Sequence, residues 1–265
     1  MPAKVSVIIP TFNMEPTIGR AIDSAASQNY PDTEIVVVDD GSSDRTRSVV
    51  EEHLTGIPPR KGVYLRIGHR GKSAALNEGI RKSNGELISI LDADDTLTPD
   101  SIDSRARFLE ARPHLDAVFS DLNLLGNNHK VYAVKKPRHL DSQPEMMYAF
   151  LSSPTTPLTI HTIMIRRTAF DKTGYFDPRF KRGEDQEFMH RMLQACVLGY
   201  LQQPTYNYYP NRRMLRQRIK TRLSSAFYKS RFISENSEGG ERLYLEFKNL
   251  AVQAAKLAYE IFLIR

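Results

Sequence analysis

The segment Leu87 to Asp95, LISILDADD, constrains the fold of this chain more than any other stretch of the sequence. Its first five residues are mostly apolar, and a short run of this kind predicts a buried strand. The three carboxylates that follow cannot continue into the core, because an unpaired buried charge is costly. We therefore expect Asp92, Asp94 and Asp95 at the carboxyl edge of a sheet, where open α/β sheets bind their ligands.

The spacing of Asp92 and Asp94 suggests a metal site. A loop can present two carboxylates at this spacing to one hard divalent cation that also carries a phosphate ligand. The alternative is a solvated acidic loop, which is common in proteins. The buried strand before the pair and the polar loops expected beside it favour the metal.

Strands and helices alternate through the first 111 residues. Strands are expected at Lys4–Ile9, Glu34–Val38, Val63–Ile67 and Leu87–Leu91, each followed by a helix. Thr98 is expected to cap the fourth helix, with Pro99 at its first position. This alternation predicts an α/β fold with a mainly parallel sheet, so that the loops after all four strands open along one edge.

The pattern changes after residue 125. A hairpin turn is expected at 126–128, a helix at 144–151, a strand at Leu158–Ile165 and a helix that begins near Glu184. His161 and His190 are single histidines, and we interpret them as structural rather than ligating. Three tyrosines near the end of this region are interpreted as packing residues, although they could stack a sugar or a base: Tyr206, Tyr208 and Tyr209.

Two other strands are expected to end in loops that suit a nucleotide. Asp39 and Asp40 can accept hydrogen bonds from a base or a ribose, and Gly41 lets a ligand approach the backbone. A capping turn is the simpler alternative. The segment from Arg70 to Lys72, with Asn77, combines positive charge with a helix start and so suits a diphosphate. It matches neither the P-loop nor the dinucleotide-binding glycine motif.

Glu184 and Asp185 stand at the predicted start of a helix. The helix dipole favours ionised carboxylates at this position, which suits a general base that takes a hydroxyl proton. Simple capping of the helix is the alternative.

Composition narrows the class of protein. The chain has 265 residues, of which 40% are hydrophobic, and no apolar run approaches the roughly 18 residues needed to span a bilayer. One cysteine, Cys196, excludes an internal disulfide framework and a cysteine-based zinc site, and we expect a cytoplasmic protein without a signal peptide. The net charge of +6 depends on eight Lys or Arg residues between Arg212 and Arg231, where no acid occurs. Such a patch favours phosphates, an anionic membrane or nucleic acid.

Five segments together resemble glycosyltransferase family 2, the nucleotide-sugar-dependent transferases with the GT-A fold. They occur in the family's order and cover roughly residues 4 to 210: VSVIIPTFN, IVVVDDGSSD, GKSAALNEGI, LDADD and GYFDPRFKRGEDQEF. The resemblance implies a GT-A domain over residues 1–210, with a nucleotide-binding part to about 125 and an acceptor part over 126–210. A basic helical extension would follow at 211–265.

The resemblance also implies roles for individual residues. Asp94 would ligate Mg²⁺ or Mn²⁺, with Asp92 as a possible second ligand, and Asp185 would be the catalytic base. Glu184, Arg212 and Arg213 would lie on the acceptor or diphosphate side. The residues that would contact the nucleotide donor are Pro10, Thr11, Asn13, Asp39, Asp40, Gly41, Lys72, Asn77, Asp92 and Ala93.

The implied activity is metal-dependent, inverting transfer of one sugar from a nucleoside-diphosphate sugar, expected to be UDP-linked, to an acceptor hydroxyl. The Gln-x-x-Arg-Trp motif of processive synthases is absent and the chain has no tryptophan, which favours single-sugar transfer. The expected acceptor is a glycan or lipid-linked glycan of the cell surface. A non-catalytic nucleotide-sugar-binding or scaffold protein is the alternative.

The basic segment 212–231 is expected to contact an anionic membrane, which would place the protein on the inner face of the cell membrane. A solvated helix face packed on the body is the alternative. No nucleic-acid partner is expected, since the segment carries no recognisable motif and its basic residues alternate with an apolar face. The oligomeric state is left open.

Overall fold

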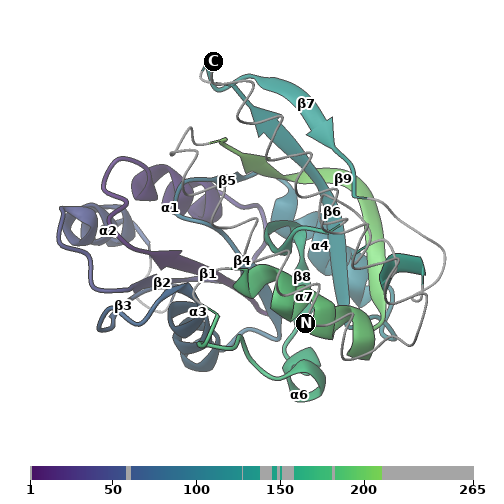
Figure 1. Cartoon of the computed structure of the whole chain (residues 1–265). Helices are drawn as coiled ribbons and strands as arrows, with labels where there is room; N and C mark the ends of the chain where they lie inside the picture. The colour runs from purple at the N-terminus through teal and green to yellow at the C-terminus, as the bar shows by residue number, and fades with distance from the viewer. Residues whose placement is uncertain are drawn as a thin grey trace, which may run out of the picture.

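A computed structural model describes residues 2–57, 61–126, 128–137, 145–147, 150, 158–180 and 183–210. These residues form one nine-stranded sheet with helices on both faces (Figure 1). The strand order is β3-β2-β1-β4-β8-β6-β9-β5, and β7 pairs with β6 outside this path. The fold is thus the α/β class that the alternating pattern predicts.

The first half of the sheet is parallel throughout. It consists of β3 (Gly62–Arg66), β2 (Thr33–Asp39), β1 (Val5–Thr11) and β4 (Leu87–Ile90). The helices between these strands are α1 (Ile18–Ala26), α2 (Thr46–Thr55) and α3 (Lys72–Lys82). All four strands therefore end at one edge of the sheet, as the sequence predicts.

The second half of the sheet is mixed. β8 (Met164–Arg166) is antiparallel to both β4 and β6 (Ala117–Leu125), whereas β9 (Leu198–Tyr208) is parallel to β6. Two strands complete this half in antiparallel pairs, β5 (Thr96–Leu97) on β9 and the predicted hairpin strand β7 (Val131–Lys135) on β6. The remaining elements are α4 (Ser101–Glu110), the 3₁₀ helix η1 (Ile160–Thr162), α6 (Ala169–Thr173) and α7 (Glu184–Ala195).

The strands alternate their side chains between two apolar layers, because successive residues of a strand point to opposite faces of the sheet. Val7 and Ile9 of β1 pack in the layer that contains α1 and α4, while Ile8 packs in the layer that contains α3, α6 and α7. Both faces are thus covered, which explains why every residue of β1 and β4 is buried.

Three expectations about local structure are wrong. The apolar run Leu158–Ile165, expected as one strand, contains a turn of 3₁₀ helix followed by the short strand β8. A short buried segment is apolar whether it is helical or extended, so the sequence pattern does not distinguish the two. Thr98 does not cap α4, which begins at Ser101; its hydroxyl donates instead to the carbonyl of Pro204 at 3.1 Å. β1 continues past Ile9 through Pro10, which lies beyond Ile8, the last residue of β1 that pairs with β4.

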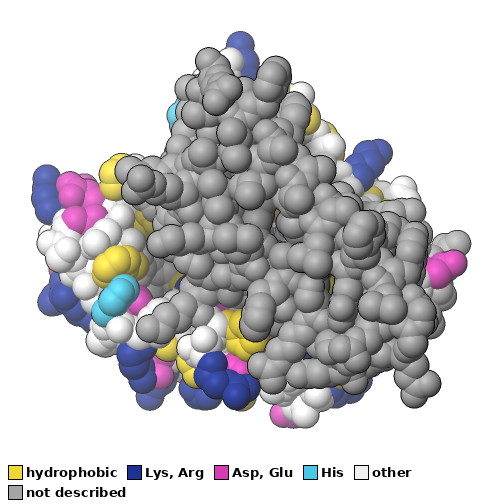
Figure 2. Space-filling model, viewed as in Figure 1, with side chains coloured by type: hydrophobic (Ala, Val, Ile, Leu, Met, Phe, Trp, Pro, Cys, Tyr) yellow, Lys and Arg dark blue, Asp and Glu magenta, His cyan; other side chains and the backbone are white. Residues whose placement is uncertain are grey.

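The part of the surface that Figure 2 colours by residue type carries side chains of both charges, with hydrophobic groups between them. None of the helices in the described ranges is both long enough and apolar enough to cross a bilayer. The predicted basic extension at 211–265, with the 212–231 segment, lies outside the described residues. Of the helix expected at 144–151, residues 145–147 and 150 are described and are helical, and the other four lie outside the described residues.

Candidate active site

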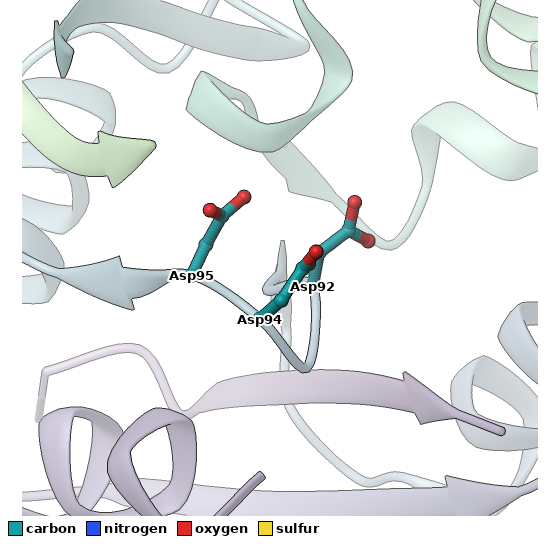
Figure 3. A group of neighbouring side chains, drawn as sticks. All are labelled: Asp92, Asp94 and Asp95. Atoms are coloured by element: carbon teal, nitrogen blue, oxygen red, sulfur yellow. The ribbon is translucent and has the colours of Figure 1, made fainter. Parts of the chain in front are cut away.

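The turn that follows β4, residues 92–95, is called the acidic loop here. Asp92, Asp94 and Asp95 each offer one carboxylate oxygen, and these oxygen atoms lie within 4.8 Å of one another (Figure 3). Leu91 fixes the start of the loop, since its N–H donates to the carbonyl of Ile8 in β1 at 3.0 Å. A cluster of carboxylate oxygen atoms is the donor set that Mg²⁺ and Mn²⁺ prefer, so the residues present fit a divalent cation.

Asp92 is held by two basic side chains, Lys72 and His161. Its Oδ1 lies 2.6 Å from Nζ of Lys72, and its Oδ2 lies 2.8 Å from Nε2 of His161. Burial opposes ionisation, but the charges of Lys72 and His161 hold the pKa of Asp92 well below its usual range. Asp92 is therefore ionised at neutral pH.

His161 is a functional-site residue that sequence reasoning missed. We interpreted it as structural, yet η1 places its ring against both Asp92 and Tyr206, whose ring centroid lies 5.5 Å away. Only the tertiary pairing of β4 with β8 brings η1 to the acidic loop. No local motif surrounds this histidine, so the sequence carried no signal for its position.

Asp95 is fully buried and is bound by the end of β9. Its Oδ2 accepts a hydrogen bond from the hydroxyl of Tyr206 at 2.8 Å, and its Oδ1 accepts one from the backbone N–H of Tyr209, also at 2.8 Å. Burial raises the pKa of Asp95 to about 7, and the charge of Asp92 adds to this shift. Asp95 thus anchors the loop to the protein, while Asp94 remains the candidate principal metal ligand.

A cavity of about 430 Å³ opens between the ends of β1 and β4. It is lined by residues at the ends of β1, β2 and β4, in the loops that follow them, and in α3: Pro10, Thr11, Phe12, Met14, Asp40, Lys72, Ala75, Asp92, Ala93 and Asp94. Seven of these are predicted donor or metal residues. The hydroxyl of Thr11 is buried and has no hydrogen-bond partner among the described residues, which leaves it available to a ligand.

The Lys72 ammonium is the positive charge of this cavity. Burial opposes its protonation, but the charge of Asp92, followed by that of Glu184, raises the pKa of Lys72 above its usual value. Lys72 opens α3, and Gly71 before it has φ +94°, a left-handed backbone that glycine adopts without strain. The predicted cationic loop therefore places one fixed positive charge beside the acidic loop.

At the edge of the cavity, the ring of Phe12 stacks on His69 with a centroid distance of 4.3 Å. Phe12 is 39% exposed, an unusual state for a large apolar ring. A flat, partly exposed aromatic face of this kind can stack a planar ligand. Neither residue was among those expected from the sequence.

The two predicted carboxylates at the end of β2, Asp39 and Asp40, differ in their relation to the cavity. Asp40 lines the cavity, but its two oxygen atoms accept hydrogen bonds from the backbone N–H groups of Arg70 and Gly71, at 2.7 and 2.8 Å. Asp39 does not line it: the residue is fully buried and accepts hydrogen bonds from Ser42 N–H and the Tyr64 hydroxyl, both at 2.7 Å. Both carboxylates thus order loops around the cavity.

Three other predicted donor residues shape the surroundings. Asn13 accepts a hydrogen bond from Ser43 N–H at 2.8 Å, and Gly41 turns the second loop with φ +82°. Asn77 donates to and accepts from the backbone of Phe176, at 2.7 and 2.9 Å. Asn77 therefore ties α3 to the segment that precedes α7.

The start of α7 faces the Lys72–Asp92 pair. Glu184 and Asp185 are both partly exposed, and their charges act on Lys72. Burial raises the pKa of Glu184, with Lys72 opposing and Asp185 adding to the shift. Arg212 and Arg213 lie outside the described residues.

Comparisons with known proteins agree with this geometry. The family model described as glycosyl transferase family 2 matches residues 6–174. An uncharacterized glycosyltransferase of Rickettsia typhi is 31% identical over 200 residues, which are 74% of this chain and 60% of that protein. The poly(ribitol-phosphate) beta-N-acetylglucosaminyltransferase TarS of Staphylococcus aureus is 30% identical over 77% of this chain and 35% of its own length. The chain thus spans only part of these relatives.

Solved structures match over nearly the whole chain. A crystal structure of S. aureus TarS gives a TM-score of 0.68 at 20% identity, covering 95% of this chain and 72% of that one. The mannosyltransferase PcManGT of Pyrobaculum calidifontis, in complex with GDP-Man and Mn²⁺, gives 0.67 at 22% identity, covering 99% and 81%. The chain therefore belongs to glycosyl transferase family 2 and has the GT-A fold.

Proposed function

We propose that this chain is a metal-dependent, inverting glycosyltransferase that moves one sugar from a UDP-linked donor to an acceptor hydroxyl. The observation that carries the proposal is the cavity at the carboxyl edge of the parallel strands. It combines a cluster of carboxylates in the acidic loop, the fixed ammonium group of Lys72 and the buried hydroxyl of Thr11, which has no hydrogen-bond partner within the described part of the chain. These groups match a hydroxyl-bearing, doubly phosphorylated ligand with its cation.

Asp94 is the proposed principal ligand of Mg²⁺ or Mn²⁺, with Asp92 as a second candidate. When bound, the cation would offset negative charge on the departing diphosphate. Lys72 would add positive charge on the same side, at the start of α3, where backbone N–H groups favour anions. The neighbour solved with GDP-Man and Mn²⁺ supports the choice of a divalent cation.

Asp185 is the proposed general base. It would accept the proton of the acceptor hydroxyl while that oxygen bonds to the anomeric carbon and the bond from this carbon to the diphosphate breaks. Attack from the face opposite the leaving group would invert the anomeric centre. Asp185 lies in the first turn of α7, and Glu184 beside it would orient the acceptor.

The choice of UDP rests on TarS, which matches in both sequence and structure and has been solved in complex with UDP and with UDP-GlcNAc. A glycan or a lipid-linked glycan is the proposed acceptor, since TarS is named for transfer to a poly(ribitol phosphate) polymer.

Contact of residues 212–231 with an anionic membrane remains a proposal. Flotation with anionic vesicles tests it, and equal flotation after neutralising Arg212, Arg213, Arg216 and Arg218 would contradict it.

Measurements of nucleotide affinity test the proposed metal-dependent binding of UDP directly. We expect UDP to bind more tightly than GDP or dTDP, and Mn²⁺ to strengthen this binding. Asp94→Ala should remove the metal-dependent part of the affinity and donor turnover without lowering the unfolding temperature. Asp103→Ala is the matched control, because Asp103 lies on α4 in an exposed ion pair with Arg107. Metal-dependent binding that survives in Asp94→Ala would refute the assignment of Asp94.

A further inference from the structure

Two side chains that do not line the cavity form hydrogen bonds with the acidic loop. Tyr206 approaches it from the end of β9, and Arg20 approaches it from α1. Neither residue belongs to the five short segments that resemble the family, and neither has a role in the proposed transfer.

Tyr206 connects three parts of the site. Its hydroxyl donates to Oδ2 of Asp95 at 2.8 Å and accepts the backbone N–H of Asp92 at 3.2 Å. Its ring stacks on His161, and His161 binds Oδ2 of Asp92 at 2.8 Å. The side chain of Tyr206 is fully buried. One phenol group therefore fixes both the first and the last residue of the acidic loop.

Arg20 holds the middle of the loop. Its guanidinium group donates to the backbone carbonyl of Asp94, and it lies over the ring of Tyr209 at 4.0 Å from the ring centroid. The backbone N–H of Tyr209 in turn donates to Oδ1 of Asp95. Arg20 thus binds the loop directly and supports the second donor to Asp95.

We propose that Tyr206 and Arg20 are positioning residues that hold the acidic loop in the conformation in which Asp94 and Asp92 bind a divalent cation. The inference rests on the proposed metal-dependent binding of a nucleoside diphosphate. Groups that hydrogen-bond to metal ligands, or to the backbone that carries them, set the orientation of those ligands, and their loss typically weakens metal affinity about 10- to 100-fold. Here the two residues act on the backbone at Asp92 and Asp94 and on the carboxylate of Asp95.

The test is calorimetric titration of UDP into the full chain with and without Mn²⁺, using Tyr206→Phe and Arg20→Met. Each variant removes a hydrogen-bonding group but leaves the lining of the cavity unchanged. We expect the enhancement of UDP affinity by Mn²⁺ to fall about tenfold in each variant, and UDP affinity without metal to stay within about twofold. Two independent variants keep the test decisive if one of them fails to fold.

Tyr200→Phe is the matched control. Tyr200 also lies on β9, and its hydroxyl also donates to a carboxylate, Oδ1 of Asp121, at 2.6 Å. A fall in the Mn²⁺ effect in Tyr206→Phe and Arg20→Met but not in Tyr200→Phe supports the proposal. An unchanged Mn²⁺ effect in a folded variant, or an equal fall in Tyr200→Phe, overturns it. If the wild-type chain shows no Mn²⁺-dependent UDP binding, the proposed function fails instead.

Discussion

The two halves of the sheet contribute to the site in different ways. The parallel half, β3-β2-β1-β4, supplies the cavity through loops that directly follow its strands. The mixed half, around β8, β6 and β9, supplies groups that come from distant parts of the chain and act on the acidic loop. The comparison indicates that the first half lines the cavity, whereas the second half contributes Tyr206 and His161, which contact the acidic loop.

The largest expected effect tests the contribution of the second half to the reaction. Asp185→Asn removes the proposed base but keeps the size of the side chain, so turnover should fall about a thousandfold, the range typical of general base catalysis. UDP affinity should stay within about twofold. Turnover is measured by release of UDP from UDP-sugars. A non-catalytic nucleotide-sugar-binding protein would instead show no turnover in either form.

The next effect concerns the contacts that connect the two halves of the sheet. Arg105 on α4 is fully buried and donates to Ser89 in β4, to Ile163 after η1 and to Ser101 in its own helix, and burial lowers its pKa to about 9. Arg105→Leu leaves these acceptors unsatisfied. We expect a loss of about 3 kcal/mol in the free energy of unfolding, measured by urea denaturation.

Arg107→Leu is the control for this experiment. Arg107 lies two residues further along α4, is mostly exposed and pairs with Asp103. Its replacement should change the free energy of unfolding by less than about 1 kcal/mol. Equal effects of the two substitutions would show that Arg105 does not join the halves.

A smaller effect is expected at the ammonium group of the cavity. Lys72→Met removes the positive charge while keeping a long side chain, so UDP affinity without metal should weaken by about 2 kcal/mol, or roughly 30-fold. Lys82→Met, at the exposed end of the same helix, should leave the affinity unchanged. Calorimetry measures both. Unaltered affinity in Lys72→Met would remove Lys72 from the donor site.

The smallest effect lies in the parallel half, far from the cavity. Glu34 is buried on β2, pairs with Lys4 at 3.0 Å and accepts hydrogen bonds from Ser6 at 2.6 Å and from the N–H of Asn84. Burial opposes ionisation, but these hydrogen bonds and Lys4 lower the pKa of Glu34 below its ordinary value of 4.5.

The ionised form of Glu34 therefore stabilises the fold above pH 4.5, and this stabilisation is lost as the pH falls through the lowered pKa. Urea denaturation between pH 7 and pH 3 should show Glu34→Gln less stable by about 1 kcal/mol at pH 7, with a weaker decline toward acid. A parallel decline in both proteins would exclude Glu34 as a source of the pH dependence.

Local sequence was sufficient to place Thr11, Lys72, Asp92 and Asp94 at one edge of a sheet. Each follows a strand or opens a helix, and parallel strands necessarily end on the same side. It gave no indication of the partners that Asp39 and Asp40 have within the protein. Their carboxylates accept hydrogen bonds from Tyr64 and from the N–H groups of residues 70 and 71, and their contact with the donor stays a prediction. Which donors lie near a carboxylate depends on how the fold brings distant segments together.

The parallel strands and the acidic loop follow from periodicity and spacing along the chain, and the family follows from the resemblance of five short segments. The partners of the acidic loop do not. His161, Tyr206 and Arg20 reach it only because β8 pairs with β4, β9 pairs with β6 and α1 packs beside β5. Contacts between residues far apart in sequence arise from strand pairing and helix packing, and a single sequence carries no local pattern for them.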